Sequence, residues 1–186
     1  MKKLFLLGAM VCALGMMTAE AQTEAKGSVM TVRVCDIDTT KADDTTLVGY
    51  VFMEHYGHTI IDRSGKEDTK EDTFEMEEYT PTMEEVREAE RLLLKKYPTI
   101  MPGEKDKLGR MTRPRLKSYV RQYIFGVASD GKRYVWVNAV SKEQTWLMDR
   151  IKEQTIHVRD GGNAFWQTLL NLDDGTMVFN MVNGEA

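Results

Sequence analysis

One stretch of this sequence repeats apolar residues at the spacing of a helix that lies on a core, and it constrains the fold most. The residues at these three- and four-residue intervals are Val86, Ala89, Leu92, Leu93 and Tyr97. Thr82-Met83-Glu84-Glu85, just before them, has the spacing of a capping box. Glutamates in the first turns and Lys95-Lys96 in the last match the helix dipole. We expect a helix that begins at Thr82 and is ended by Pro98.

Most of the remaining chain alternates apolar and polar residues with the period of a β-strand. The segments expected to be strands are residues 28–37, 47–56, 59–62, 116–128, 133–140, 164–172 and 176–182. Asp130-Gly131 and Asp173-Asp174-Gly175 are typical of the tight turns that join antiparallel strands. Residues 141–151 are expected to form a short helix or irregular bridge anchored by Trp146 and Leu147. The pattern predicts an α+β fold, with one main helix packed on an antiparallel sheet of successive hairpins.

The glycine pair Gly161-Gly162 could cradle a phosphate or form a turn. A phosphate loop needs a helix after the glycines, with its N-terminus facing the anion. Residues 164–172 alternate like a strand instead, and residues 155–158 precede the loop. We therefore interpret residues 160–163 as a hairpin connection.

The N-terminus has the three parts of a secretory signal peptide. Lys2 and Lys3 precede an apolar run over residues 4–17, and small residues at Ala19 and Ala21 predict cleavage before Gln22. We expect residues 1–21 to be a signal peptide and residues 22–186 to be one α+β domain, exported to the periplasm or beyond. Within it, residues 22–81 hold N-terminal strands and an acidic loop, and residues 82–186 the helix and the hairpin sheet. No stable membrane insertion is expected after cleavage.

Charge and cysteine content argue against several classes of function. The net charge is −4, acidic residues dominate residues 62–90, and basic residues dominate residues 91–117. The basic stretch spans a Pro/Gly-rich loop beside an acidic run instead of forming one face with stacking aromatics, and the protein is expected to be exported, so we expect no nucleic-acid partner. After signal cleavage Cys35 is the sole cysteine, which excludes an internal disulfide and favours a buried thiol.

No assembled catalytic constellation is recognisable in the sequence. His55 and His58 are a weak metal-ligand pair, because a glycine separates them and no third histidine or cysteine lies near in sequence, although Glu54 and Asp62 are close by. The nucleophile elbow Gly-x-Ser-x-Gly is absent. We expect no enzymatic activity, no catalytic residues, no metal and no cofactor.

The organisation resembles the cystatin-like class, and in particular small exported bacterial proteins of uncharacterised function. The resemblance covers residues 82–186 and rests on Arg121-Gln122-Tyr123, the Gly131 hairpin, the Asp160-Gly161-Gly162 turn and the terminal Val182-Asn183-Gly184-Glu185-Ala186. It implies a helix on an antiparallel sheet and no known activity. Gln122-Tyr123-Ile124-Phe125-Gly126 is similar to the Gln-x-Val-x-Gly motif of cystatin protease inhibitors. Gln122, Ile124 and Gly126 therefore define an alternative function, protease inhibition by an exposed wedge.

The leading hypothesis is a non-catalytic binding or structural module. The candidate binding residues are aromatics on the expected strands: Tyr119, Tyr123, Tyr134, Trp136 and Trp166. If one face of the sheet is uncovered, these residues would contact a protein, peptide or carbohydrate partner. If both faces are covered, the same residues belong to the core.

Overall fold

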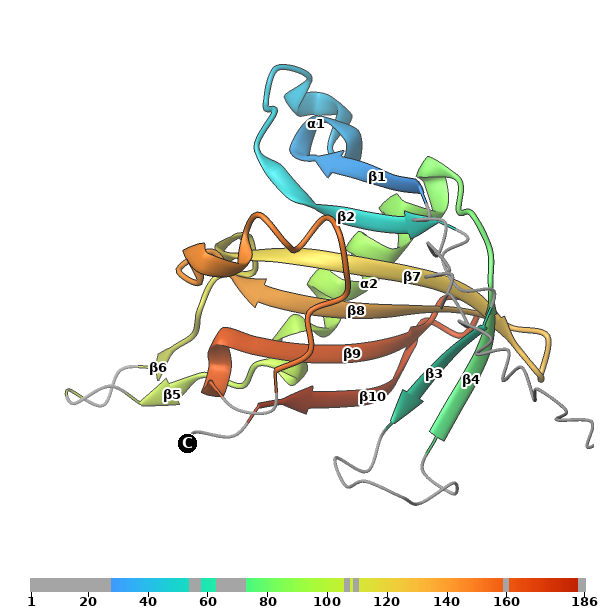
Figure 1. Ribbon diagram of the computed structural model, residues 1–186. Coiled ribbons are helices and arrows are strands. Elements are labelled where there is room, and N and C mark those ends of the chain that lie inside the picture. Colours follow the sequence, from blue (N-terminus) through green and yellow to red (C-terminus); the bar gives the residue numbers. More distant parts are fainter. Residues whose placement is uncertain are drawn as a thin grey trace, which may run out of the picture.

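The computed structural model describes residues 28–53, 58–62, 73–105, 108, 111–158 and 161–183. One long helix, α2 (Met83–Ile100), packs on a mostly antiparallel sheet (Figure 1). The sheet has eight strands. The expected α+β fold class is thus confirmed. Residues 1–21, predicted to be a signal peptide, lie outside the described residues. Among the described helices, none combines the length and the apolar composition needed to cross a membrane.

The main sheet has the strand order β1-β2-β7-β8-β9-β10. Its strands are β1 (Ser28–Arg33), β2 (Leu47–Met53), β3 (His58–Asp62), β4 (Thr73–Glu78), β7 (Tyr119–Ala128), β8 (Arg133–Ser141), β9 (Phe165–Asn171) and β10 (Thr176–Val182). Strands β7 to β10 pair antiparallel in succession. Strand β2 pairs with the first half of β7 in parallel, and β4 pairs with its second half antiparallel. A separate two-stranded sheet joins β5 (Glu104–Lys105) and β6 (Met111–Thr112).

The short helices lie in the connections between strands. They are α1 (Val34–Ile37), η1 (Thr39–Lys41), η3 (Leu116–Ser118), η4 (Thr145–Leu147) and η5 (Gly162–Ala164). Strand β1 therefore ends earlier than expected, and Cys35 lies on α1, partly buried, rather than in a strand. The Asp36 carboxylate accepts a hydrogen bond from the Arg33 backbone N–H at 2.7 Å, which favours this helical turn over a continued strand.

Helix α2 begins as the capping box predicts. The Thr82 hydroxyl accepts from the Glu85 backbone N–H at 3.3 Å, and the Glu85 carboxylate accepts from the Thr82 N–H at 2.8 Å. The expected end at Pro98 is wrong, because the helix continues through it to Ile100. Proline removes one helical hydrogen bond here, but burial of the neighbouring Tyr97 and Ile100 in the core favours the extra turn.

The face of the sheet that α2 covers forms the largest core cluster. It joins Val86, Ala89, Leu93 and Tyr97 of α2 to strand residues that include Val51, Tyr123, Val135, Val137, Trp166 and Leu170. The helix lies behind the sheet in Figure 1, and the connection between β8 and β9 crosses in front of it. The two faces of the sheet therefore carry different coverings.

The face opposite α2 has two smaller apolar clusters. At one end, Leu147, Ile151 and Ile156 of the β8–β9 connection pack on strand residues that include Val120 and Phe165. At the other end lies the cluster that we call the open-side cluster: Phe52, Met76, Ile124, Tyr134, Trp136 and Leu169. Leu147 anchors the connection as expected, whereas Trp146 does not, because 65% of its surface is exposed.

Candidate functional site

A polar pair anchors the β8–β9 connection to the sheet. Gln122 of β7 and Asn138 of β8 are cross-strand partners, and both side chains are buried. The Gln122 amide donates to the carbonyl oxygens of Ile151 at 2.7 Å and Gln154 at 2.8 Å. Its oxygen accepts from Asn138 Nδ2 at 2.7 Å and from the Ile156 backbone N–H at 2.9 Å. Gln122 therefore uses both ends of its amide to hold this connection in place.

The residues of the inhibitor hypothesis lie within the sheet rather than at its tip. Gln122 and Ile124 are buried. A Cβ atom added at Gly126 would lie 2.6 Å from Met76 Cγ, because β4 crosses close to this position. The β7–β8 hairpin turns instead at Asp130–Gly131, where Gly131 has a φ of 77°. In this arrangement the motif has no exposed surface to offer to a protease cleft.

The five candidate aromatics are divided between the two faces of the sheet, and all five are buried. Tyr119, Tyr123 and Trp166 belong to the core cluster under α2. Tyr134 and Trp136 belong to the open-side cluster. The structure thus brings two of the five together on the face opposite α2, where both are buried.

Tyr134 and Trp136 form the centre of the candidate site. The Tyr134 hydroxyl donates to Asp130 Oδ2 at 2.7 Å, and its ring meets Phe74 edge-on with centroids 4.8 Å apart. The Trp136 ring stacks with His157 at a centroid distance of 6.2 Å and an interplanar angle of 25°. Trp136 is only 4% exposed, and its indole N–H has no hydrogen-bond partner among the described residues.

His157 lies at the solvent side of this stack. Its side chain is exposed, and Thr155 Oγ1 lies 3.1 Å from its Nε2 atom. Desolvation lowers the pKa of His157, so its neutral form is favoured. A neutral imidazole can either donate or accept a hydrogen bond beside the unpartnered Trp136 N–H.

Trp166 provides a comparison on the covered face. Its indole N–H also lacks a regular hydrogen bond among the described residues. Burial raises the pKa of Tyr119, and the nearby Trp166 indole lowers it in part. The indole N–H and the Tyr119 hydroxyl are nevertheless not in hydrogen-bond geometry. The Trp166 ring lies edge-on to Tyr119 at 5.6 Å, inside the core.

A buried ion pair joins α2 to the sheet. Arg121 Nε and Nη2 donate to the two carboxylate oxygens of Glu90 at 3.0 and 3.1 Å, and the Tyr123 hydroxyl donates to the same carboxylate. Burial raises the pKa of Tyr123 well above its usual value. Burial alone would lower the pKa of Arg121, but Tyr123 and Glu90 raise it above its usual range. The cluster is closed to solvent and ties the helix to β7.

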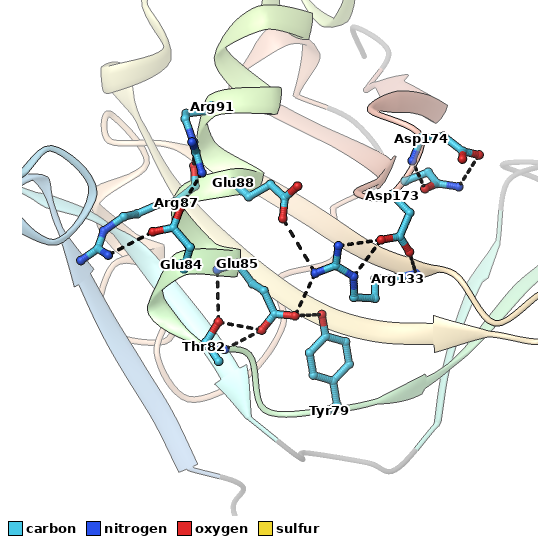
Figure 2. Close-up of polar contacts among 11 residues, drawn as sticks. Tyr79, Thr82, Glu84, Glu85, Arg87, Glu88, Arg91, Arg133, Asp173 and Asp174 are labelled. Carbon is cyan, nitrogen blue, oxygen red and sulfur yellow. Dashed lines mark hydrogen bonds and ion pairs between the residues drawn. The ribbon is translucent and has the colours of Figure 1, made fainter.

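A second, more exposed charge cluster surrounds Arg133 at the start of β8 (Figure 2). Arg133 Nη2 and Nε donate to Asp173 Oδ1 at 2.6 and 2.9 Å, and hydrogen bonds from Arg133 lower the pKa of Asp173. Arg133 Nη1 donates to Glu85 at 3.2 Å and lies 3.8 Å from Glu88. Glu85 also accepts from the Tyr79 hydroxyl at 3.0 Å. These contacts connect the start of α2 to β8 and to the turn before β10.

The structure does not describe the side chains of the two weak metal candidates, His55 and His58. His55 lies outside the described residues, and His58 is described only as the first residue of β3. Within the described part of the chain, no group of three or more histidine, cysteine, aspartate or glutamate residues is arranged to hold a metal ion.

Some members of the candidate site gave little signal in the sequence. Phe74 and Met76 alternate with glutamates in β4, a strand that we did not expect from the sequence because it carries only these two apolar side chains within an acidic run. The interpretation of residues 160–163 as a hairpin connection is wrong, because residues 155–158 form neither strand nor helix and β9 pairs instead with β8 and β10. His157 therefore reaches Trp136 from a loop. No protein-family model, curated protein or solved structure matches this chain.

Proposed function

We propose that this protein is an exported, non-catalytic binding module of bacterial origin with a cystatin-like architecture. Its binding region is the open-side cluster around Tyr134 and Trp136. The partner is a peptide, protein or carbohydrate that offers a flat surface and a hydrogen-bond acceptor.

The observation that supports this proposal is the unpartnered N–H of Trp136. A buried donor without a partner costs about 1–3 kcal/mol. Buried donors without a partner are rare in folded proteins. A hydrogen-bond acceptor on a ligand could pair with the Trp136 N–H and remove this cost. His157, whose ring stacks on Trp136, is an exposed residue, so a partner would approach Trp136 beside it.

The proposal is tested by comparing two conservative tryptophan variants. Trp136→Phe and Trp166→Phe each remove one indole N–H and keep an aromatic ring, but only Trp136 lies on the face opposite α2. Each purified protein is assayed against malto-, cello- and chito-oligosaccharides and against a peptide array. We expect one of these probes to bind the wild type, with at least tenfold weaker binding by Trp136→Phe and unchanged binding by Trp166→Phe. Absence of binding by all probes, or equal weakening by both variants, would overturn the proposal.

The exported location is tested separately. Mass spectrometry of the protein from fractionated cells should find Gln22 as its N-terminal residue, in the periplasm or the medium. A mature chain that begins at Met1, or that stays with the membranes, would contradict export.

A further inference from the structure

Strand β10 forms one end of the main sheet. It pairs with β9 along one edge, and none of the described strands pairs with its other edge. All of its residues are partly or fully exposed, and Val178 is 40% exposed. The outer edge of β10 therefore presents backbone N–H and C=O groups together with apolar side chains.

The composition of β10 is unusual for a sheet edge. Its sequence, Thr-Met-Val-Phe-Asn-Met-Val, contains no charged residue and no proline over seven residues. Natural proteins protect exposed edges with lysine, proline or very short strands, because an unprotected edge pairs with other strands. A shift in register between Met177 and Phe179 is the one irregularity along β10.

We propose that β10 pairs antiparallel with β10 of a second copy of this chain. The two sheets then become one continuous sheet across a two-fold axis. This inference is independent of the binding function proposed above, which concerns the face of the sheet rather than its edge.

Charge distribution favours a second copy as the occupant. When two identical strands pair, the charged side chains of one strand lie near the same charges on the other and repel them. Strand β10 carries no charge, so two copies of it pair without this repulsion. The turn before β10 is also balanced, since Asp173 pairs with Arg133 and Asp174 pairs with Lys132, each at 2.6 Å. Like charges therefore do not oppose the approach of the two copies at this end.

Strand β1, at the other end of this strand order, is less suited to such pairing. Strand β1 ends at the exposed Arg33, its register shifts there, and the chain turns directly into α1. Pairing of two β10 edges uses the outer edge of β10 in both copies, so the assembly closes as a dimer.

The test measures oligomeric state and its dependence on one side chain. Protein purified as the cells export it is studied by sedimentation equilibrium from low micromolar to millimolar concentration, with Val178→Lys and a control, Val127→Lys. Val127 is 36% exposed but lies in β7, where β4 and β8 occupy both edges. We expect the wild type and Val127→Lys to dimerise, and Val178→Lys to dimerise at least tenfold more weakly.

Hydrogen exchange of the wild type provides a second readout that does not depend on a variant. Protection of the β10 amides should rise with protein concentration, while that of β7 stays constant. A monomer at all concentrations, or a dimer that Val178→Lys leaves unchanged, would overturn the proposal. A monomer whose β10 amides are protected only by an added apolar peptide would overturn it too, and would assign the edge to a peptide partner.

Discussion

Replacing Glu90 by leucine would leave the Arg121 guanidinium charged and without its carboxylate in the core. The two side chains of this pair are 9% and 5% exposed, so water cannot replace the lost contact. Removing one partner of such a buried pair typically costs about 3–5 kcal/mol. A domain of this size has a free energy of unfolding of roughly 5–15 kcal/mol, so Glu90→Leu should remove a large part of it.

The assay is urea denaturation followed by circular dichroism, with Glu84→Leu as a matched control. Glu84 lies on the same helix and pairs with Arg91, but its side chain is 68% exposed, so we expect a change of less than about 1 kcal/mol. The triple variant Glu90→Leu, Arg121→Met, Tyr123→Phe removes the whole polar cluster and should recover to within about 2 kcal/mol of the wild type. A loss below about 1 kcal/mol for Glu90→Leu would refute the reasoning, since the pair would then be effectively solvated.

Three further predictions concern the sheet and its surface. Gly49→Ala should lower the free energy of unfolding by at least about 2 kcal/mol, because its Cβ would lie 2.1 Å from the Arg121 carbonyl oxygen; an unchanged urea midpoint would contradict this. Burial and a neighbouring carboxylate raise the pKa of Tyr134 to about 12, above its unfolded value of about 10. Its contribution to stability is therefore complete below pH 10 and is lost as pH rises through 12. Tyr134→Phe should make thermal unfolding less sensitive to pH in this range, and an unchanged pH profile would count against the shift. Arg133→Gln should cost about 1–2 kcal/mol in urea titrations, and Arg91→Gln, at an exposed pair, less than 1 kcal/mol; equal losses would show that the Arg133 cluster adds nothing.

The sequence by itself determined the elements whose signals are local. The capping box at Thr82, the Asp130–Gly131 turn and the period-two runs of β7 to β10 depend on neighbours a few residues away. The α+β class follows from these elements. The same local rules placed the helix end at Pro98, where burial of Ile100 outweighed the cost of a proline in the last turn.

The candidate site was decided by tertiary structure. The five strand aromatics looked equivalent in the sequence, since alternation shows that two faces exist but not which face a helix will cover. Packing of α2 placed Tyr119, Tyr123 and Trp166 in the core and left Tyr134 and Trp136 on the opposite face.

Long-range contacts decided what surrounds these residues. His157 reaches Trp136 from a loop 21 positions away, and that loop is held by the Gln122 amide, 34 positions from Ile156. The outer edge of β10, with which none of the described strands pairs, likewise depends on the order of the strands, which no local pattern encodes. Side-chain chemistry near a site can be inferred from sequence, but its partners are set by chain segments that meet only when the sheet is assembled.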